Sequence, residues 1–155
     1  MTPYEMTENV FRKPRFVAII PRWSVVPVTR RQTNGEHIFL VARYATLVAD
    51  LLGSKVNRFL LLDYALRHDD EEAVTGDLPS GSPLAAHKEG PIRNEIYLIV
   101  KAADRLEAYF YGIEEVMLGN QFMAEQIPDL YKKFIDALTA CPGHTDAVID
   151  AVGAV

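Results

Sequence analysis

The sequence predicts an all-α domain, and three observations support that prediction. Apolar residues recur at steps of three and four from Leu40 to Leu51, which is the stripe of an amphipathic helix. A second segment, residues 92–119, is rich in helix formers and has no breaker before Gly112. No alternating pattern typical of a strand occurs outside residues 16–28. We therefore expect a bundle of helices.

Composition predicts one soluble globular domain spanning residues 1–155, with 49% apolar and 24% charged residues. The single cysteine, Cys141, cannot form an internal disulfide and fits a reducing compartment, so we expect a cytoplasmic protein. The apolar run at residues 16–20 is too short for a signal peptide or a spanning helix, so no membrane role is expected. The net charge of −5, without a long basic run, disfavours a nucleic acid polymer as partner.

The first part of the chain is expected to lead into the amphipathic helix. Residues 21–34 contain two prolines and several turn formers, which predicts an irregular or extended segment. The helix then starts near residues 34–36 and ends at Gly53. His37 lies three residues before Leu40 on the apolar stripe. We therefore expect its imidazole to point into the core.

Residues 55–69 form the next predicted helix. This segment is apolar nearly all round, as a helix crossing the middle of a bundle would be. His68 continues the stripe of Leu61, Tyr64 and Ala65, so it is expected to reach the same interior as the first histidine. The Pro, Gly and Ser content of residues 78–91 predicts a loop, which we expect to be the most mobile element.

Residues 92–119 are predicted to form one long helix with a carboxylate on its apolar face. Asp104 shares that face with apolar and aromatic residues, namely Tyr97, Val100, Ala108 and Tyr111. A buried, unpaired carboxylate is strongly unfavourable, so Asp104 requires a basic partner or a metal ion. The apolar surface of residues 107–118 exceeds what a small bundle easily covers, which favours a homo-oligomer.

The C-terminal part is predicted to add two helices. Pro128 and Asp129 are expected to open the first, since proline is favoured in the first turn of a helix. The Cys-Pro-Gly sequence at residues 141–143 closes it. A short final helix is expected to follow, capped by Thr145.

Three predicted helices each direct metal-ligand side chains toward the interior. The first helix contributes His37, the second His68 and Asp69, and the long helix Asp104. Two imidazoles and two carboxylates form a mixed nitrogen and oxygen set. Such a set suits a divalent transition metal such as Zn, Mn, Co or Fe.

This order of His, His-Asp and Asp on successive helices resembles the HD-domain metal-dependent phosphohydrolases, and the finer pattern resembles their 5'-deoxynucleotidase branch. The matching stretches are "PRW" at 21–23, "EH" at 36–37, "HDDEEAVTGDLP" at 68–79 and "KAADRLEA" at 101–108. Each stretch alone is a weak signal, but all of them in the family's order are a strong one. The resemblance implies a single HD-domain helical bundle with a motif-bearing core at about residues 21–118.

The resemblance also implies which residues bind the metal ion and the substrate. The implied ligands of one divalent metal, with Co, Mn or Zn expected and Mg also compatible, are His37, His68, Asp69 and Asp104. Arg22 would bind the substrate phosphate, because its guanidinium forks onto phosphate oxygens. Lys101 is a second candidate on the phosphate side. Trp23 and Val25 would pack against the base or sugar, and Thr75 is a further substrate-binding candidate.

Two acidic residues have implied catalytic roles. Glu72 lies four residues after His68, on the same face if the helix continues, and would orient or deprotonate the attacking water. Asp77 follows the turn at residues 75–76 and matches the family's general acid, which protonates the leaving 5' oxygen of the nucleoside. The implied enzyme is a 5'-deoxynucleotidase that acts on a small-molecule deoxynucleotide and releases deoxynucleoside and phosphate.

One departure from the family pattern keeps a second substrate open. Asp77 and Asp104 are only 27 residues apart, whereas the single-phosphate nucleotidases have a longer insert here. This trimming resembles the compact HD phosphohydrolases of phages, some of which remove the whole triphosphate from deoxynucleotides such as dATP. The first alternative is therefore a dNTP triphosphohydrolase. The second alternative, which does not depend on this separation, is a non-catalytic, nucleotide-sensing HD module, although such a module would normally lack one of the metal ligands and none is missing here.

Each candidate residue also has an ordinary structural explanation when considered alone. His37 fits a core histidine bonded to backbone, and Asp104 fits a buried ion pair with a neighbouring basic residue. Arg22 and Trp23 fit a surface cation–aromatic pair, and Asp77 fits a turn residue. The functional interpretation depends on their occurrence together in the family's order.

Overall fold

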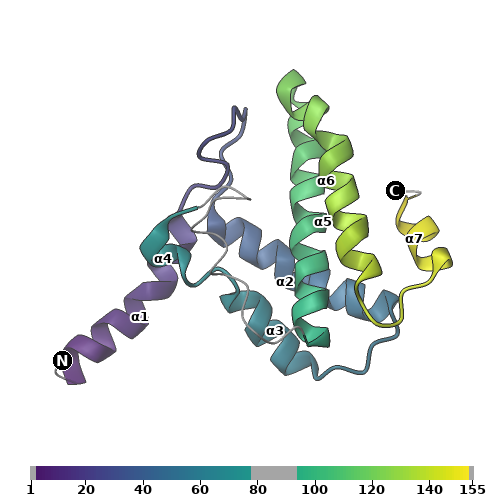
Figure 1. Cartoon of the computed structure of the whole chain (residues 1–155). Coiled ribbons are helices and arrows are strands. Elements are labelled where there is room, and N and C mark those ends of the chain that lie inside the picture. The colour runs from purple at the N-terminus through teal and green to yellow at the C-terminus, as the bar shows by residue number, and fades with distance from the viewer. Residues whose placement is uncertain (1–2, 78–93, 154–155) are drawn as a thin grey trace.

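A computed structural model of the chain describes residues 3–77 and 94–153, which fold into helices (Figure 1). The helices are α1 (Pro3–Ile19), α2 (Asn34–Leu51), α3 (Arg58–Arg67), α4 (Glu72–Thr75), α5 (Glu95–Met117), α6 (Gln121–Thr139) and α7 (Asp146–Gly153). These ranges contain no strand, and their one isolated bridge joins Pro21 to Thr33. The all-α prediction is confirmed. The loop predicted at residues 78–91 lies outside the described residues.

Helix α2 begins and ends where its sequence predicts. The Thr33 side chain accepts a hydrogen bond from the backbone N–H of Glu36, whose carboxylate accepts from the N–H of Thr33 at 2.7 Å. This reciprocal capping box satisfies two backbone donors that the first turn would otherwise leave unpaired. At the other end, Gly53 adopts a φ of 63°, which ends the helix in the left-handed region that glycine enters without strain.

The core lies where α2, α5 and α6 pack together, with α5 and α6 side by side along most of their length (Figure 1). Asn94 and Asn120 cap the two long helices through their side chains. Gly112 allows α6 to approach α5 closely, because a Cβ there would lie 2.9 Å from a methyl carbon of Leu130. Their close pairing fixes the position of every residue on the inner face of α5.

Helix α3 lies at the edge of the bundle and not in its middle. Its buried residues are Leu61 and Ala65, whereas Phe59 is 75% exposed and Leu66 is 52% exposed. The prediction of a central helix is therefore wrong. An apolar residue at a given position does not require burial, since much of a folded protein's surface is apolar. The buried pair still places His68, three residues after Ala65, at the interior end of the helix.

Helix α6 begins at Gln121, seven residues before the start that the proline predicts. The Asn120 side chain accepts from the N–H of Met123 at 3.1 Å and provides the cap. Pro128 lies inside the helix on its exposed side. Burial of Met123 and Leu130 on the opposite side stabilises the helix across the proline. The short C-terminal helix is confirmed, since the Thr145 hydroxyl accepts from the N–H of Val148.

Helix α1 extends the fold beyond what the sequence pattern predicts. Its C-terminal part packs on α2 and α4, and Val17 is buried there. Gly35 makes that approach possible, because a Cβ would lie 3.1 Å from the carbonyl oxygen of Ala18. Residues 16–28 have a strand-like alternation in the sequence but do not form a strand. They are helical up to Ile19 and irregular after it.

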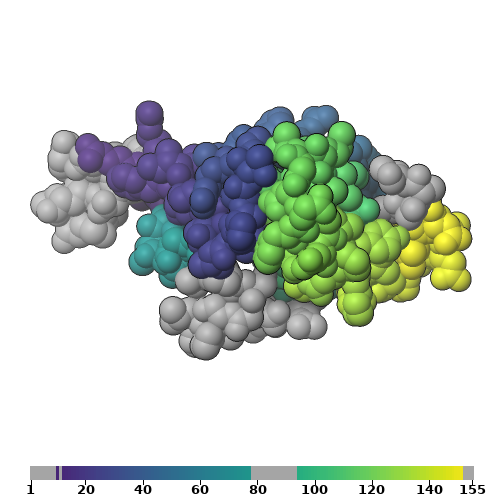
Figure 2. Space-filling model, turned by 90° about the horizontal axis from the view of Figure 1, so that it is seen from above, coloured from purple at the N-terminus to yellow at the C-terminus, as the bar shows by residue number. Residues whose placement is uncertain are grey.

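The irregular segment between α1 and α2 is attached to the end of α5. In Figure 2 this segment forms the dark blue surface between the purple of α1 and the green of α5. Glu115 of α5 accepts hydrogen bonds from the backbone N–H groups of Thr29 and Arg30. The Tyr111 hydroxyl donates to the carbonyl of Arg30. These bonds hold the segment that presents Arg22 to the interior.

Candidate metal centre

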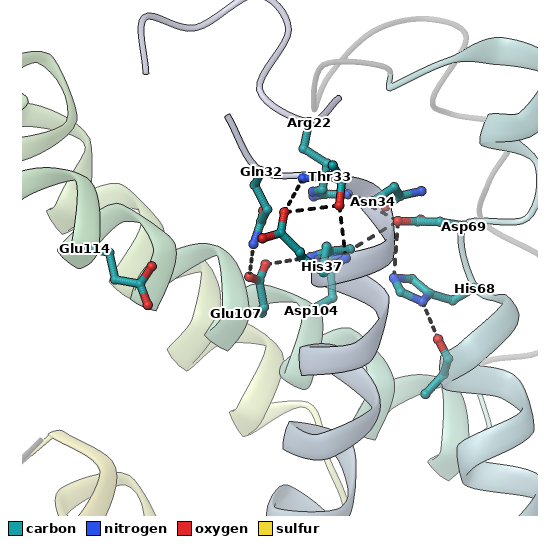
Figure 3. A network of polar contacts seen from close by, with 12 residues as sticks. Arg22, Gln32, Thr33, Asn34, His37, His68, Asp69, Asp104, Glu107 and Glu114 are labelled. Atoms are coloured by element: carbon teal, nitrogen blue, oxygen red, sulfur yellow. Dashed lines mark hydrogen bonds and ion pairs between the residues drawn. The ribbon is translucent and has the colours of Figure 1, made fainter. Parts of the chain in front are cut away.

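His37 is fully buried in the first turns of α2, and one of its two ring nitrogens forms a hydrogen bond within the protein. Its Nδ1 lies 2.6 Å from Oε2 of Glu107 on α5. Its Nε2 lies 3.3 Å from Oδ1 of Asp104 and 3.5 Å from Oδ2 of Asp69, and neither contact has hydrogen-bond geometry. The core-histidine explanation with a backbone partner does not apply. Nε2 is therefore directed at two carboxylates (Figure 3).

His68 follows the last residue of α3 and has the same arrangement. Its Nδ1 lies 2.7 Å from the carbonyl oxygen of Ala65, which can only accept, so Nδ1 is protonated. Its Nε2 is buried and lies 3.5 Å from Oδ2 of Asp69. The two imidazole rings are 5.5 Å apart. Potential ligand atoms of His37, His68 and Asp69 lie within 4.8 Å of one another, the spacing that a bound metal ion requires.

Asp104, in the middle of α5, lies beside this cluster: its Oδ1 is 3.3 Å from Nε2 of His37, but among the described residues the group of ligand atoms within 4.8 Å of one another contains only His37, His68 and Asp69. Burial would raise the pKa of Asp104, but the contacts with His37 outweigh burial and hold the pKa well below its usual range. Burial and the charge of Arg22 oppose protonation of His37, yet its contacts with Asp104 and Glu107 raise the pKa of His37 to about 9. The carboxylates thus create a field that favours positive charge at Nε2, and a divalent cation satisfies it as a proton does.

Arg22 supplies a cation on the side of the irregular segment. Its Nη1 lies 3.2 Å from Oδ2 of Asp69 and 3.4 Å from Oδ1 of Asn34. Burial opposes its charge, but four surrounding carboxylates outweigh that cost and raise its pKa. They are Asp104, Asp69, Asp77 and Glu72. The Nε–H of Arg22 is buried without a hydrogen-bond partner in the described ranges, so a donor remains for an anion.

Glu72 and Asp77 reach this region from the short helix α4 and the turn after it. Glu72 is buried, and its Oε2 accepts from Nδ2 of Asn34 at 3.0 Å. Asp77 is half-buried and close enough to influence the pKa of Arg22. The fold therefore brings both predicted catalytic carboxylates to the side of the cluster where Arg22 lies.

Sequence reasoning missed two residues that complete the network, Glu107 and Gln32. Glu107 is 2% exposed and accepts from Nε2 of Gln32 at 2.6 Å, while Gln32 itself is 1% exposed. The signal for Glu107 was present, because it lies three residues after Asp104 on the same face of a helix. Gln32 lies in irregular backbone, where no periodicity indicates the direction of a side chain.

Comparison with known protein families shows which family the chain belongs to. The family model of the HD domain matches residues 19–98, just over half of the chain. The chain belongs to the HD-domain family. The matched range contains the irregular segment and α2 through α4, and therefore His37, His68 and Asp69. No curated protein matches the sequence.

Solved structures share the fold of this HD domain. An HD-domain phosphohydrolase from Listeria innocua aligns with a TM-score of 0.63 and 19% identity, covering 81% of this chain and 76% of that one. The PH0347 protein from Pyrococcus horikoshii OT3 aligns with a TM-score of 0.61 and 21% identity, covering 87% of this chain and 97% of that one. At these identities the likeness establishes the fold.

Within the described ranges, no helix combines the length and apolar character needed to cross a bilayer.

The four other residues that the sequence predicts to bind substrate differ in their contacts and exposure. Trp23 stacks on Tyr111 with ring centroids 5.2 Å apart. Lys101 is half-buried on α5, one turn before Asp104. Val25 is 69% exposed on the irregular segment. The exposed Thr75 hydroxyl bonds to backbone carbonyls of residues 71 and 76. Substrate binding by these four residues stays a prediction.

The donor set of the HD domain fits a divalent metal ion. Each histidine has Nδ1 committed to an acceptor and a buried Nε2 that has no hydrogen-bond partner in the part of the chain described. Metal-binding histidines show this same division of their two nitrogens. Carboxylate oxygens complete a mixed set suited to Zn, Mn, Co or Fe.

An apolar cavity of about 320 Å³ lies farther along α2. It is lined only by aliphatic and aromatic side chains, so it offers no metal-binding groups.

Proposed function

We propose that this HD domain is a metal-dependent phosphohydrolase that cleaves deoxynucleotides at the α-phosphate and releases deoxynucleoside and phosphate. The supporting observation is that Nε2 of His37 and Nε2 of His68 are buried beside Asp69 without a hydrogen-bond partner among the described residues. The Arg22 guanidinium lies 3.2 Å from the same Asp69. We propose His37, His68, Asp69 and Asp104 as ligands of one divalent ion, with Co, Mn or Zn expected. That ion supplies Lewis-acid chemistry, since it lowers the pKa of water and polarises phosphoryl oxygens.

Arg22 binds the phosphate in this mechanism. Its buried Nε–H has no hydrogen-bond partner among the described residues, an unfavourable arrangement that a phosphate oxygen would relieve by accepting a hydrogen bond. The charge that develops on the phosphoryl oxygens during attack is stabilised by the fixed guanidinium. The nearby carboxylates keep Arg22 protonated throughout.

Glu72 and Asp77 move the protons. Asn34 donates to one oxygen of Glu72 and so orients the carboxylate, which takes a proton from the attacking water. As the water oxygen bonds to phosphorus, the bond from phosphorus to the 5' oxygen breaks, and Asp77 gives its proton to that oxygen. The products are a nucleoside and phosphate. Glu72 gains the proton that water loses and Asp77 loses the proton that the nucleoside gains, so the total number of protons on the protein is unchanged.

The triphosphate substrate is the second candidate, favoured by one observation. Asp77 and Asp104 are 27 positions apart, a shorter separation than in the single-phosphate nucleotidases that the sequence resembles. This trimming resembles the compact HD phosphohydrolases of phages, some of which release the whole triphosphate of a dNTP as one product. The mechanism at the α-phosphorus is the same for both substrates.

Product analysis distinguishes these candidates. Purified protein is incubated with Mn, Co, Zn or Mg and with panels of dNMPs, dNTPs and ribonucleotides, and the products are separated by chromatography. Nucleoside and orthophosphate from monophosphates alone establish the deoxynucleotidase, and intact triphosphate from a dNTP establishes the alternative. Absence of any product rejects both and favours the nucleotide-sensing module.

The Asp69→Ala variant tests the site itself. Loss of this ligand is expected to abolish turnover while the helical content by circular dichroism is retained. Asp70→Ala is the matched control, because the adjacent carboxylate pairs with Lys13 at 3.5 Å and lies outside the cluster. Retained turnover in the Asp69→Ala variant would reject the assignment.

A further inference from the structure

Glu107 is a buried carboxylate that the proposed reaction does not use. It lies on α5, one turn after Asp104, and is 2% exposed. A buried carboxylate is retained only where charged or hydrogen-bonding partners compensate for the loss of water. Its Oε2 lies 2.6 Å from Nδ1 of His37, and this contact faces away from the side where the metal-ligand atoms gather.

The second oxygen of Glu107 is fixed as well. Gln32 donates to Oε1 through Nε2 at 2.6 Å, and Gln32 is 1% exposed. The backbone carbonyl of Gln32 in turn accepts from the N–H of Arg22 at 2.9 Å. One bond from each side therefore holds the carboxylate in a single orientation, and Figure 3 shows the chain of contacts from Gln32 through Glu107 to His37.

The two histidines of the centre differ in this respect. Nδ1 of His68 has a neutral partner, the carbonyl oxygen of Ala65 at 2.7 Å, whereas Nδ1 of His37 has a carboxylate. A charged acceptor forms a stronger hydrogen bond than a neutral one. It also polarises the ring and makes the opposite nitrogen a better electron donor toward a metal ion. His37 is therefore built as the stronger of the two nitrogen ligands.

We propose that Glu107 is a positioning residue of the metal centre, which with Gln32 fixes the proton of His37 on Nδ1, directs Nε2 at the metal ion and increases metal affinity through its charge. This inference rests on the metal site of the proposed function but not on its substrate. A purely structural role for Glu107 predicts a different result. In that case its replacement would change the stability of the fold and leave metal affinity unchanged.

The Glu107→Gln variant separates these roles. The new side chain keeps an oxygen that can accept from Nδ1, and Gln32 can turn its amide to accept from the new NH₂, because its own Oε1 has no partner in the described part of the chain. The charge alone is lost. The matched control is Glu114→Gln on the same helix, since Glu114 has a 60% exposed side chain and lies away from the cluster (Figure 3).

Affinity for Mn²⁺ and Zn²⁺ is measured by calorimetric titration of metal-free protein. Glu107→Gln is expected to weaken binding about 10- to 100-fold relative to wild type, whereas Glu114→Gln is expected to match wild type. Thermal melts in chelator monitor folding independently of metal. Equal affinities of the Glu107→Gln variant and wild type would overturn the proposal, whatever the melts show.

A second variant covers the case in which Glu107→Gln does not fold. Gln32→Met keeps the carboxylate and all four proposed ligands but removes the donor that orients Glu107, so a smaller loss of metal affinity is expected. Unchanged affinity in this variant would overturn the proposal in that case. Wild type that binds metal but hydrolyses no nucleotide would reject the proposed function and leave this inference intact. Wild type that binds no metal would reject both.

Discussion

At the scale of single residues, the chemistry of the centre depends on which nitrogen of each histidine the protein already uses. Nδ1 of His37 and Nδ1 of His68 each have an acceptor at 2.6 and 2.7 Å, so both Nε2 atoms face the cluster. The same principle applies to Arg22. Its Nη1 forms an ion pair with Asp69, whereas its Nε–H has no hydrogen-bond partner among the described residues. In the described part of the chain these Nε2 and Nε atoms have no hydrogen-bond partner, and they are the atoms that the proposed metal ion and phosphate would engage.

Replacement of Asp77 tests its proposed role as general acid. Asp77→Asn removes the proton that the leaving 5' oxygen needs, so kcat is expected to fall about 10²- to 10⁴-fold with KM changed little. Steady-state kinetics on the substrate found by product analysis measures both constants. Asp63→Asn is the control, because Asp63 is an exposed residue of α3 paired with Arg67. A larger change in KM than in kcat would contradict the acid role.

At the scale of elements, α4 and the turn after it place the catalytic carboxylates. Helix α4 is a single turn that positions Glu72, and Gly76 ends it with a φ of 69° and a ψ of 179°. This backbone conformation is essentially restricted to glycine. The direction of Asp77 as it leaves the helix therefore depends on the absence of a side chain at residue 76.

The Gly76→Ala variant tests this dependence. Nothing lies within 4 Å of the new Cβ, so the effect is conformational strain of about 1 to 3 kcal/mol. Relief of that strain is expected to redirect Asp77 and lower kcat. Gly53→Ala is the matched control, since Gly53 has a φ of 63° and equally open surroundings at the end of α2. A similar fall in kcat in both variants would show that general destabilisation, and not the direction of Asp77, is the cause.

Glu115 joins the irregular segment to α5, and its attachment depends on pH. Burial would raise the pKa of Glu115, but hydrogen bonds from the Asn120 side chain and two backbone N–H groups outweigh burial and lower it. Because the pKa of Glu115 is lower in the folded state, its ionised carboxylate stabilises the fold at pH values above the unfolded-state pKa of about 4.3. That stability is lost as pH falls through the folded-state pKa.

Glu115→Gln is expected to remove this pH-dependent contribution. At pH 7 the variant should lose about 1.5 to 3 kcal/mol of unfolding free energy, because an amide cannot accept from every donor now facing the carboxylate. The difference from wild type should narrow as pH falls below about 4. Urea unfolding at a series of pH values measures it, with the exposed Glu114→Gln as control. A difference that is constant with pH would contradict the assignment.

At the scale of the whole molecule, the centre joins elements far apart in the chain. His37 comes from α2, His68 and Asp69 from the end of α3, and Asp104 from α5, with α1 and α4 packed alongside. A ligand that contacts all three helices binds only when they are assembled. Its binding free energy therefore adds to the stability of the fold. Self-association through the residues near 107–118 stays a prediction.

Metal ions are accordingly expected to raise the melting temperature of the protein. At a free Mn²⁺ or Zn²⁺ concentration 100 times Kd, the stabilisation is about 2.7 kcal/mol. For a chain of this size that corresponds to an increase of roughly 5 to 11 °C. Differential scanning fluorimetry with metal and with chelator measures the shift. The Asp69→Ala variant should show none, and an equal shift in that variant would point to metal bound elsewhere.

The sequence by itself determined the helices with clear periodic or capping signals. The start of α2 near residues 34–36 and its end at Gly53 are predicted from the sequence. The order of His37, His68, Asp69 and Asp104 along the chain led to the HD-domain family that the comparison then established. These features are local, because caps, stripes and motifs act within a few residues of one another.

Only the tertiary structure decided which polar residues meet. The edge position of α3, the start of α6 at Gln121 and the helical form of α1 depend on packing between elements, which competes with local preference. The bond from Glu107 to His37 spans 70 residues, and Gln32 reaches Glu107 across 75. No periodicity encodes such pairs. They arise because helix packing excludes water, so most buried polar groups form hydrogen bonds with partners within the protein.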